Sequence, residues 1–146
     1  MLQGHRDIKS TPGAHMSADS LGQGLFAANG MAFAAKLDKK DHRIYVILGD
    51  GEVEEDQVWE TTMNSSHYKL DSIIAILDYN DLQTDGSDEE VMNISPIDNK
   101  FSAFGCNIIK IDGHDIEAIS KAVNETKLVK IYICILRYNF IVFSFY

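Results

Sequence analysis

The chain has few of the residues that mark a disulfide-stabilised or nucleic-acid-binding protein. Its 146 residues include two cysteines, Cys106 and Cys134, which are far apart and stand in no metal-binding spacing. This usage favours a reducing compartment over a disulfide framework, so we expect a cytoplasmic protein. Lysine and arginine are also scarce, because 13 of them face 22 acids and leave a net charge of −9. Neither a nucleic acid nor an anionic membrane surface is therefore an expected partner.

Long hydrophobic runs are missing except near the C-terminus. The first ten residues, MLQGHRDIKS, lack the apolar core of a secretory signal peptide. Residues 128–146 are mostly apolar or aromatic and approach the length of about 20 residues that spans a bilayer. Arg137 in the middle of this tail and Lys130 near its start argue against a membrane helix. We expect no membrane span.

The rest of the chain alternates between helix-like and strand-like segments. In residues 17–37, apolar side chains recur at the three- and four-residue steps of a helix with one buried face: Leu21, Leu25, Ala28, Met31 and Ala35. The segment RIYVIL at 43–48 is a short apolar run ended by glycine, and it predicts a strand that is buried on both faces.

The same alternation continues to the C-terminal part of the chain. A second helical stripe covers 54–68, and SIIAILDYN at 72–80 predicts a second buried strand. A further strand, helix and strand are expected at 107–111, 115–126 and 130–136. Alternating helices and apolar strands predict an α/β fold in which a parallel sheet is flanked by helices on both faces.

Two polar residues follow the ends of successive predicted strands. Asp50 lies in a Gly-Asp-Gly turn after the first strand, and Asn80 ends the second, thirty residues later. Ligands of such sheets bind outside the carboxyl ends of the strands, so these side chains can converge there. A carboxylate and an amide oxygen suit Mg²⁺, and Gly51 lets the backbone approach a ligand closely.

Two other interpretations of this region are open. Gly-Asp-Gly and Asp-Tyr-Asn-Asp are also ordinary turn sequences after strands. The run of acids from Asp50 to Asp56 could suggest a calcium loop, but an EF-hand requires glycine where Glu55 stands. For most of these acids we expect a solvated helix face.

Several motifs in order resemble the transketolase family, especially its short N-terminal subunit type. They are TPGAHMSADSLGQGLFAANGMAFAAKL, YVILGDGEVEEDQVWETTM, HYKLDSIIAILDYNDLQTDG and IDGHD. The resemblance covers about residues 2 to 127. It implies an incomplete transketolase N-terminal-like fold: a thiamine-diphosphate-binding domain fragment at 1–127, and a hydrophobic tail at 128–146 that does not resemble the family.

The resemblance also implies the site residues and the cofactors, thiamine diphosphate and Mg²⁺. Asp50, the Asn80 side chain and the backbone carbonyl of Leu82 would bind the metal. Gly51 would lie against the diphosphate, Gly49 would also bind the cofactor, and Leu21 would face the thiamine. Two further roles follow from the family: His5 matches a catalytic-pocket histidine that reaches the substrate, and Glu55 matches a glutamate that links the two active sites of a dimer.

The activity that the resemblance implies is transfer of a two-carbon ketol unit from a ketose to an aldose, with sugar phosphates as substrates. The partner would be a separate pyrimidine-binding subunit or domain, in a homo- or hetero-oligomer. The chain departs from the family at Arg6, Asp19, Asp56 and Asp81, where proline or glycine is usual. The three acids would weaken an anion site.

Three alternatives remain beside this interpretation. Another thiamine-diphosphate enzyme, such as a deoxyxylulose-phosphate synthase, shares the Gly-Asp-Gly motif. A non-catalytic, truncated paralogue would keep the motif without binding the cofactor, and the unfamiliar tail and late start of the domain favour it. A phosphoacceptor α/β domain that uses Asp50 is the third and the most remote.

Overall fold

The structure is a computed structural model that describes residues 7–128 and the strand at 133–138. Helices and strands alternate along the chain, with a short two-stranded element inserted after the second strand. The elements are α1 (Gln23–Leu37), β1 (Ile44–Gly49), η1 (Gly51–Glu54), α2 (Asp56–His67), β2 (Ile73–Tyr79), β3 (Leu82–Gln83), β4 (Gly86–Ser87), α3 (Asp88–Val91), α4 (Ile97–Ala103), β5 (Asn107–Asp112), α5 (Ile116–Thr126) and β6 (Ile133–Tyr138).

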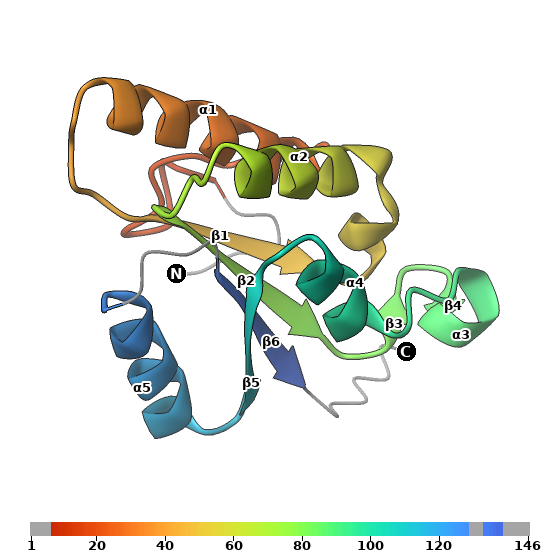
Figure 1. Cartoon of the computed structure of the whole chain (residues 1–146). Coiled ribbons are helices and arrows are strands. Elements are labelled where there is room, and N and C mark those ends of the chain that lie inside the picture. Colours follow the sequence, from red (N-terminus) through yellow and green to blue (C-terminus); the bar gives the residue numbers. More distant parts are fainter. Residues whose placement is uncertain (1–6, 129–132, 139–146) are drawn as a thin grey trace.

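Four strands form one parallel sheet in the order β1-β2-β6-β5, as Figure 1 shows. The register of the first pair places Ile44 opposite Ile73 and Gly49 opposite Asp78. The carboxyl ends of β1 and β2 therefore meet at one edge of the sheet, and the loops that follow them are neighbours. The prediction of a parallel sheet flanked by helices is confirmed.

Helices lie on both faces of the sheet because the crossovers run in opposite directions. The connections from β1 to β2 and from β2 to β5 run one way across the sheet, whereas the β5–α5–β6 connection returns. Right-handed crossovers of opposite direction place their helices on opposite faces. Accordingly, α1, α2 and α4 share one face, and α5 lies on the other (Figure 1).

The main core lies between the sheet and the α1, α2 and α4 layer. Its centre includes Phe101 of α4, which is fully buried, and Trp59 of α2 packs against it with ring centroids 5.1 Å apart. The other buried members come from the three helices, from the inward sides of β1 and β2, and from η1 and the connecting segments: Leu25, Ala28, Ala32, Val46, Leu48, Val53, Val58, Leu70, Ile73, Ala75, Leu77, Tyr79, Ile94, Ile97 and Cys106.

The first helix is shorter than predicted, and its buried face is rotated. Gly22, with a φ of 80°, precedes the helix, so Leu21 lies outside it. Met31 is exposed, whereas Asn29 and Ala32 are buried. Asn29 can face the core because its side-chain amide donates to the Thr61 carbonyl and to Ser65 Oγ of α2 at 3.2 and 3.0 Å.

The prediction that β1 is buried on both faces is wrong for one face. Tyr45 and Ile47 are 44% and 51% exposed, while Val46 and Leu48 between them are buried. The reason is that β1 lies at the edge of the sheet. On that face, helix α5 packs over Ile74 of β2 and Ile109 of β5 and not over β1. In the described part of the chain, no helix covers the outer side chains of β1.

Part of the predicted hydrophobic tail is a strand in the middle of the sheet. β6 pairs with β2 on one side and with β5 on the other. Among the residues that the structure describes, no helix is long and apolar enough to cross a membrane. The division into a domain at 1–127 and a separate tail at 128–146 stays a prediction.

Truncation of the central aromatic residue is expected to destabilise the domain strongly. We expect Phe101→Ala to lower the free energy of unfolding by about 3–5 kcal/mol, because it leaves a cavity beneath Trp59. Phe26 of α1 is 59% exposed, so the matched Phe26→Ala change should stay within about 0.5 kcal/mol. Urea unfolding followed by circular dichroism measures both; equal losses would contradict the assignment of the core.

Candidate cation and cofactor site

Asp50 joins the ends of the two neighbouring strands β1 and β2. Its side chain is buried, with 3% exposure, directly after β1. Its Oδ2 accepts a hydrogen bond from the backbone N–H of Asn80 at 2.8 Å, just past the end of β2. Asp50 and the backbone of Asn80 therefore meet at the carboxyl edge of the sheet. The predicted convergence of the two side chains stays a prediction.

The loop after β2 turns tightly around the Asn80 side chain. Asn80 Oδ1 accepts from the backbone N–H of Leu82 at 2.9 Å, and Asp81 between them has a φ of 59°. This left-handed conformation is the reason that glycine suits position 81, although aspartate tolerates it better than most residues. An amide oxygen has two lone pairs, so Asn80 Oδ1 retains one for a further partner.

The buried acids of the site interact through their charges. Burial raises the pKa of the Asp50 carboxyl above its ordinary value, while the backbone N–H of Asn80 acts in the opposite direction. Burial and, next, the charge of Asp50 raise the pKa of Asp88 from 3.8 to about 6. The site therefore concentrates negative charge in a place with little water.

Glu52 connects the Gly-Asp-Gly turn to the turn before α1. Its Oε1 accepts from the backbone N–H of Gly22 at 2.9 Å, and its Oε2 accepts from that of Gly49 at 3.4 Å. Glu52 is therefore not one of the solvated acids, whereas Glu55 and Asp56 are exposed as expected for most of the acids in this run. No local pattern indicates this contact, because it joins turns that are thirty residues apart.

Gln83 of β3 covers the Gly-Asp-Gly turn from the other side. A Cβ atom on Gly51 would lie 3.3 Å from the Cβ of Gln83, a tight contact that glycine avoids. Gln83 Nε2 donates to Glu54 Oε1 at 2.6 Å and to Asp88 Oδ1 at 3.2 Å. Neither Gln83 nor Asp88 was predicted to belong to the site, because nothing in the local sequence pattern indicates that β3 folds back onto η1.

The remaining predicted site residues are placed as follows. Leu21 is half exposed in the turn before α1, and Glu55 lies beside Gly22 at the start of α2. Glu52 thus brings the Leu21 turn and the Gly-Asp-Gly turn together. His5, the predicted catalytic residue, lies outside the described residues. Away from the site, Asp115 caps α5 by accepting from the N–H groups of Glu117 and Ala118.

The donor set fits a hard divalent cation better than a transition metal. Within the part of the chain that the structure describes, no group of three or more histidine, cysteine, aspartate and glutamate side chains is placed to hold a metal ion. The strand ends instead offer one buried carboxylate, one amide oxygen and the loop backbone. Mg²⁺ is commonly held by such oxygen atoms, with one or two carboxylates and phosphate oxygens.

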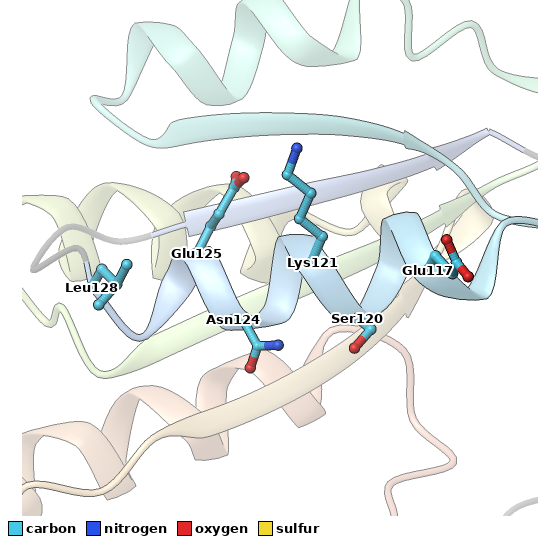
Figure 2. A pocket seen from close by; sticks show the side chains of 6 residues that line it. All are labelled: Glu117, Ser120, Lys121, Asn124, Glu125 and Leu128. Atoms are coloured by element: carbon cyan, nitrogen blue, oxygen red, sulfur yellow. The ribbon is translucent and has the colours of Figure 1, made fainter.

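A pocket elsewhere on the molecule does not belong to this site. It is an open depression of about 520 Å³ at the surface of α5, on the opposite side of the sheet from α1 and α2 (Figures 1 and 2). None of its lining residues is a strand-end residue; they are Glu117, Ser120, Lys121, Asn124, Glu125 and Leu128.

Comparison with known protein families identifies the class of the domain. A family model described as "Transketolase, thiamine diphosphate binding domain" matches residues 1–142. Among curated proteins, the 6-deoxy-6-sulfo-D-fructose transketolase subunit of a Clostridium species is 43% identical over 127 residues, or 87% of this chain and 46% of that protein. An apulose-4-phosphate transketolase subunit of Phocaeicola vulgatus is 41% identical over 119 residues, or 82% and 42%.

Solved structures agree with this assignment. The crystal structure of transketolase from Campylobacter jejuni superposes with a TM-score of 0.81 at 32% identity, covering 86% of this chain and 21% of that one. Fold and family match together identify a domain of the parallel α/β class that is similar to the thiamine-diphosphate-binding domains of transketolases. The chain belongs to the transketolase family, and it spans less than half the length of the curated relatives described above.

The raised pKa of Asp88 predicts a specific pH dependence of stability. The Asp88 carboxyl binds its proton more tightly in the folded chain than in the unfolded chain. Protonated Asp88 therefore stabilises the fold below pH 3.8, and this contribution is lost as the pH rises to about 6. We therefore expect the urea midpoint of Asp88→Asn to rise relative to that of the parent chain as the pH increases from 4 to 6. Above pH 6, the difference between the two midpoints should stay constant. Metal-free unfolding curves measure it; a difference independent of pH would contradict the assignment.

Proposed function

We propose that this chain binds Mg²⁺ and thiamine diphosphate as part of a transketolase-type enzyme. In this proposal, the enzyme transfers a two-carbon ketol unit from a ketose to an aldose, with sugar phosphates as substrates. The observation that carries the proposal is the buried Asp50 carboxylate bonded to the Asn80 backbone at the ends of adjacent parallel strands. Membership of the transketolase family supports the reaction class.

The metal ligands in this proposal are Asp50, the Asn80 side chain and the carbonyl oxygen of Leu82. The hydrogen bond from Leu82 N–H to Asn80 Oδ1 supports the proposal, because it fixes the amide while leaving one lone pair of that oxygen. Burial of Asp50 supports it as well, since a low-dielectric surrounding strengthens the attraction between a carboxylate and a cation.

The cofactor site is formed by the turns that Glu52 joins. Gly49 and Gly51 would lie beside the diphosphate, and Leu21 would lie beside the thiamine. When bound, thiamine diphosphate supplies the electron sink for breaking and forming the carbon–carbon bond. The described residues of this chain contribute binding and orientation, by fixing the two turns relative to the strand ends. His5 is the proposed contact to the sugar substrate.

The proposed partner is a separate pyrimidine-binding subunit, with Glu55 near the contact between active sites. Relatives that carry the word "subunit" in their names support a two-chain enzyme. Glu55 is exposed at the start of α2, where a second chain can reach it. We place the enzyme in the cytoplasm, because the two cysteines are few and far apart. Cys106 is a free, buried thiol, and burial raises its pKa to about 12, so it is unreactive.

Loss of the Asp50 carboxylate should abolish cofactor binding. We expect Asp50→Ala to weaken thiamine diphosphate binding in the presence of Mg²⁺ by about 100-fold or more, because even the outer partners of a metal account for about 10–100-fold. Isothermal titration calorimetry measures the affinity, with and without the C-terminal subunit of a two-subunit transketolase.

The control is Asp41→Ala, which removes an exposed acid before the opposite end of β1. It should leave the affinity unchanged. If the parent chain binds no cofactor even with the C-terminal subunit present, the proposed function is wrong and the non-catalytic alternative is correct. If binding occurs, transfer of two-carbon units between sugar phosphates is the next assay.

A further inference from the structure

Asp88 carries a buried carboxylate oxygen that lacks a partner. The side chain begins the short helix α3 and is 3% exposed. Oδ1 accepts a hydrogen bond from Gln83 Nε2 at 3.2 Å, whereas Oδ2 is fully buried and has no hydrogen-bond partner in the structure. Leaving a carboxylate oxygen unpaired away from water is costly, so such an oxygen needs an explanation.

The surroundings of Asp88 are acidic. After burial, the charge of Asp50 is the largest influence that raises the pKa of Asp88, and Asp81 and Glu54 act in the same direction. The two salt bridges between described residues, Lys40 with Asp38 and Lys110 with Asp98, lie elsewhere. Nothing in the described part of the chain therefore pairs a positive side chain with these four acids.

Asp88 is also tied to the loop that would hold the cation. Its backbone N–H donates to the Asp81 carbonyl at 3.2 Å, next to Leu82. Through Gln83, its side chain is linked to Glu54 of η1, directly after the Gly-Asp-Gly turn. Hydrogen bonds therefore tie Asp88 to the loop after β2 and, through Gln83, to η1 after β1, and the charge of Asp50 is close enough to act on it.

We propose that Asp88 is a positioning residue that supplies a second carboxylate to a divalent-cation site at Asp50. It acts as an outer partner of the cation and allows the chain to bind the cation before any cofactor is present. This inference rests on the proposed function, because it places the cation at the same strand ends. It adds a residue that the predicted ligand set of Asp50, Asn80 and Leu82 does not contain.

The test is Mn²⁺ binding to the full chain without cofactor, measured by electron paramagnetic resonance of the free ion at pH 7.5. We expect Asp88→Asn to weaken Mn²⁺ binding by about 10–100-fold, as the loss of outer partners of bound metals does. Without metal, the same variant should unfold at a higher urea concentration than the parent chain, because it removes a buried charge that has no partner.

The matched control is Glu89→Gln, which removes one charge from the next, exposed residue of α3. It should change the affinity less than about twofold, because an exposed charge is screened by solvent. Asp50→Asn should abolish Mn²⁺ binding. If Asp88 is a cation partner, Asp88→Asn is more stable than the parent chain without metal and binds Mn²⁺ more weakly. If Asp88 only supports the loop, the same change lowers the stability.

Four results would overturn the inference. If Asp88→Asn binds Mn²⁺ as tightly as the parent chain while Asp50→Asn does not bind, this inference fails and the proposed site stands. If Asp88→Asn and Glu89→Gln weaken Mn²⁺ binding equally, the effect comes from the overall negative charge of the surface and not from Asp88 itself. An Asp88→Asn chain that is less stable and binds more weakly would show a purely structural role. If the parent chain binds no Mn²⁺, both the inference and the proposed metal site fail.

Discussion

The hydrogen bond from the Asn80 backbone to the Asp50 carboxylate is the contact on which the site depends. It joins the ends of β1 and β2 where the regular strand pairing has stopped. Since one partner is a carboxylate and the contact is buried, it is stronger than a bond between neutral groups at the surface. This bond consequently fixes the Gly-Asp-Gly turn and the Asn80 loop relative to each other.

A second set of contacts fixes the loops that surround this bond. Glu52 holds the turn at Gly22, and Gln83 packs on Gly51 while its amide joins Glu54 to Asp88. In both cases a partly buried charged or polar side chain forms hydrogen bonds within the domain. The loops of the site are therefore held by acidic side chains whose charges repel one another. The stability of the site depends on the group that neutralises these charges.

The sequence predicted those features that follow from local periodicity. The short apolar runs located β1 and β2, and the acid and amide after them located the strand-end site. Sequence patterns do not tell which face of an edge strand is covered, so the exposure of Tyr45 and Ile47 was missed. Glu52 and Asp88 were missed for a related reason: their partners lie in other loops, and no periodicity links them.

The strand order has a consequence for the way in which this domain folds. β6 is the last described strand of the chain, yet it lies in the middle of the sheet, between β2 and β5. Within the described sheet, β5 has no other strand as a neighbour, so it can join only after residues 133–138 are available. During synthesis the sheet must stay open until these residues have left the ribosome, and its closure depends on contacts of long sequence separation, which form slowly.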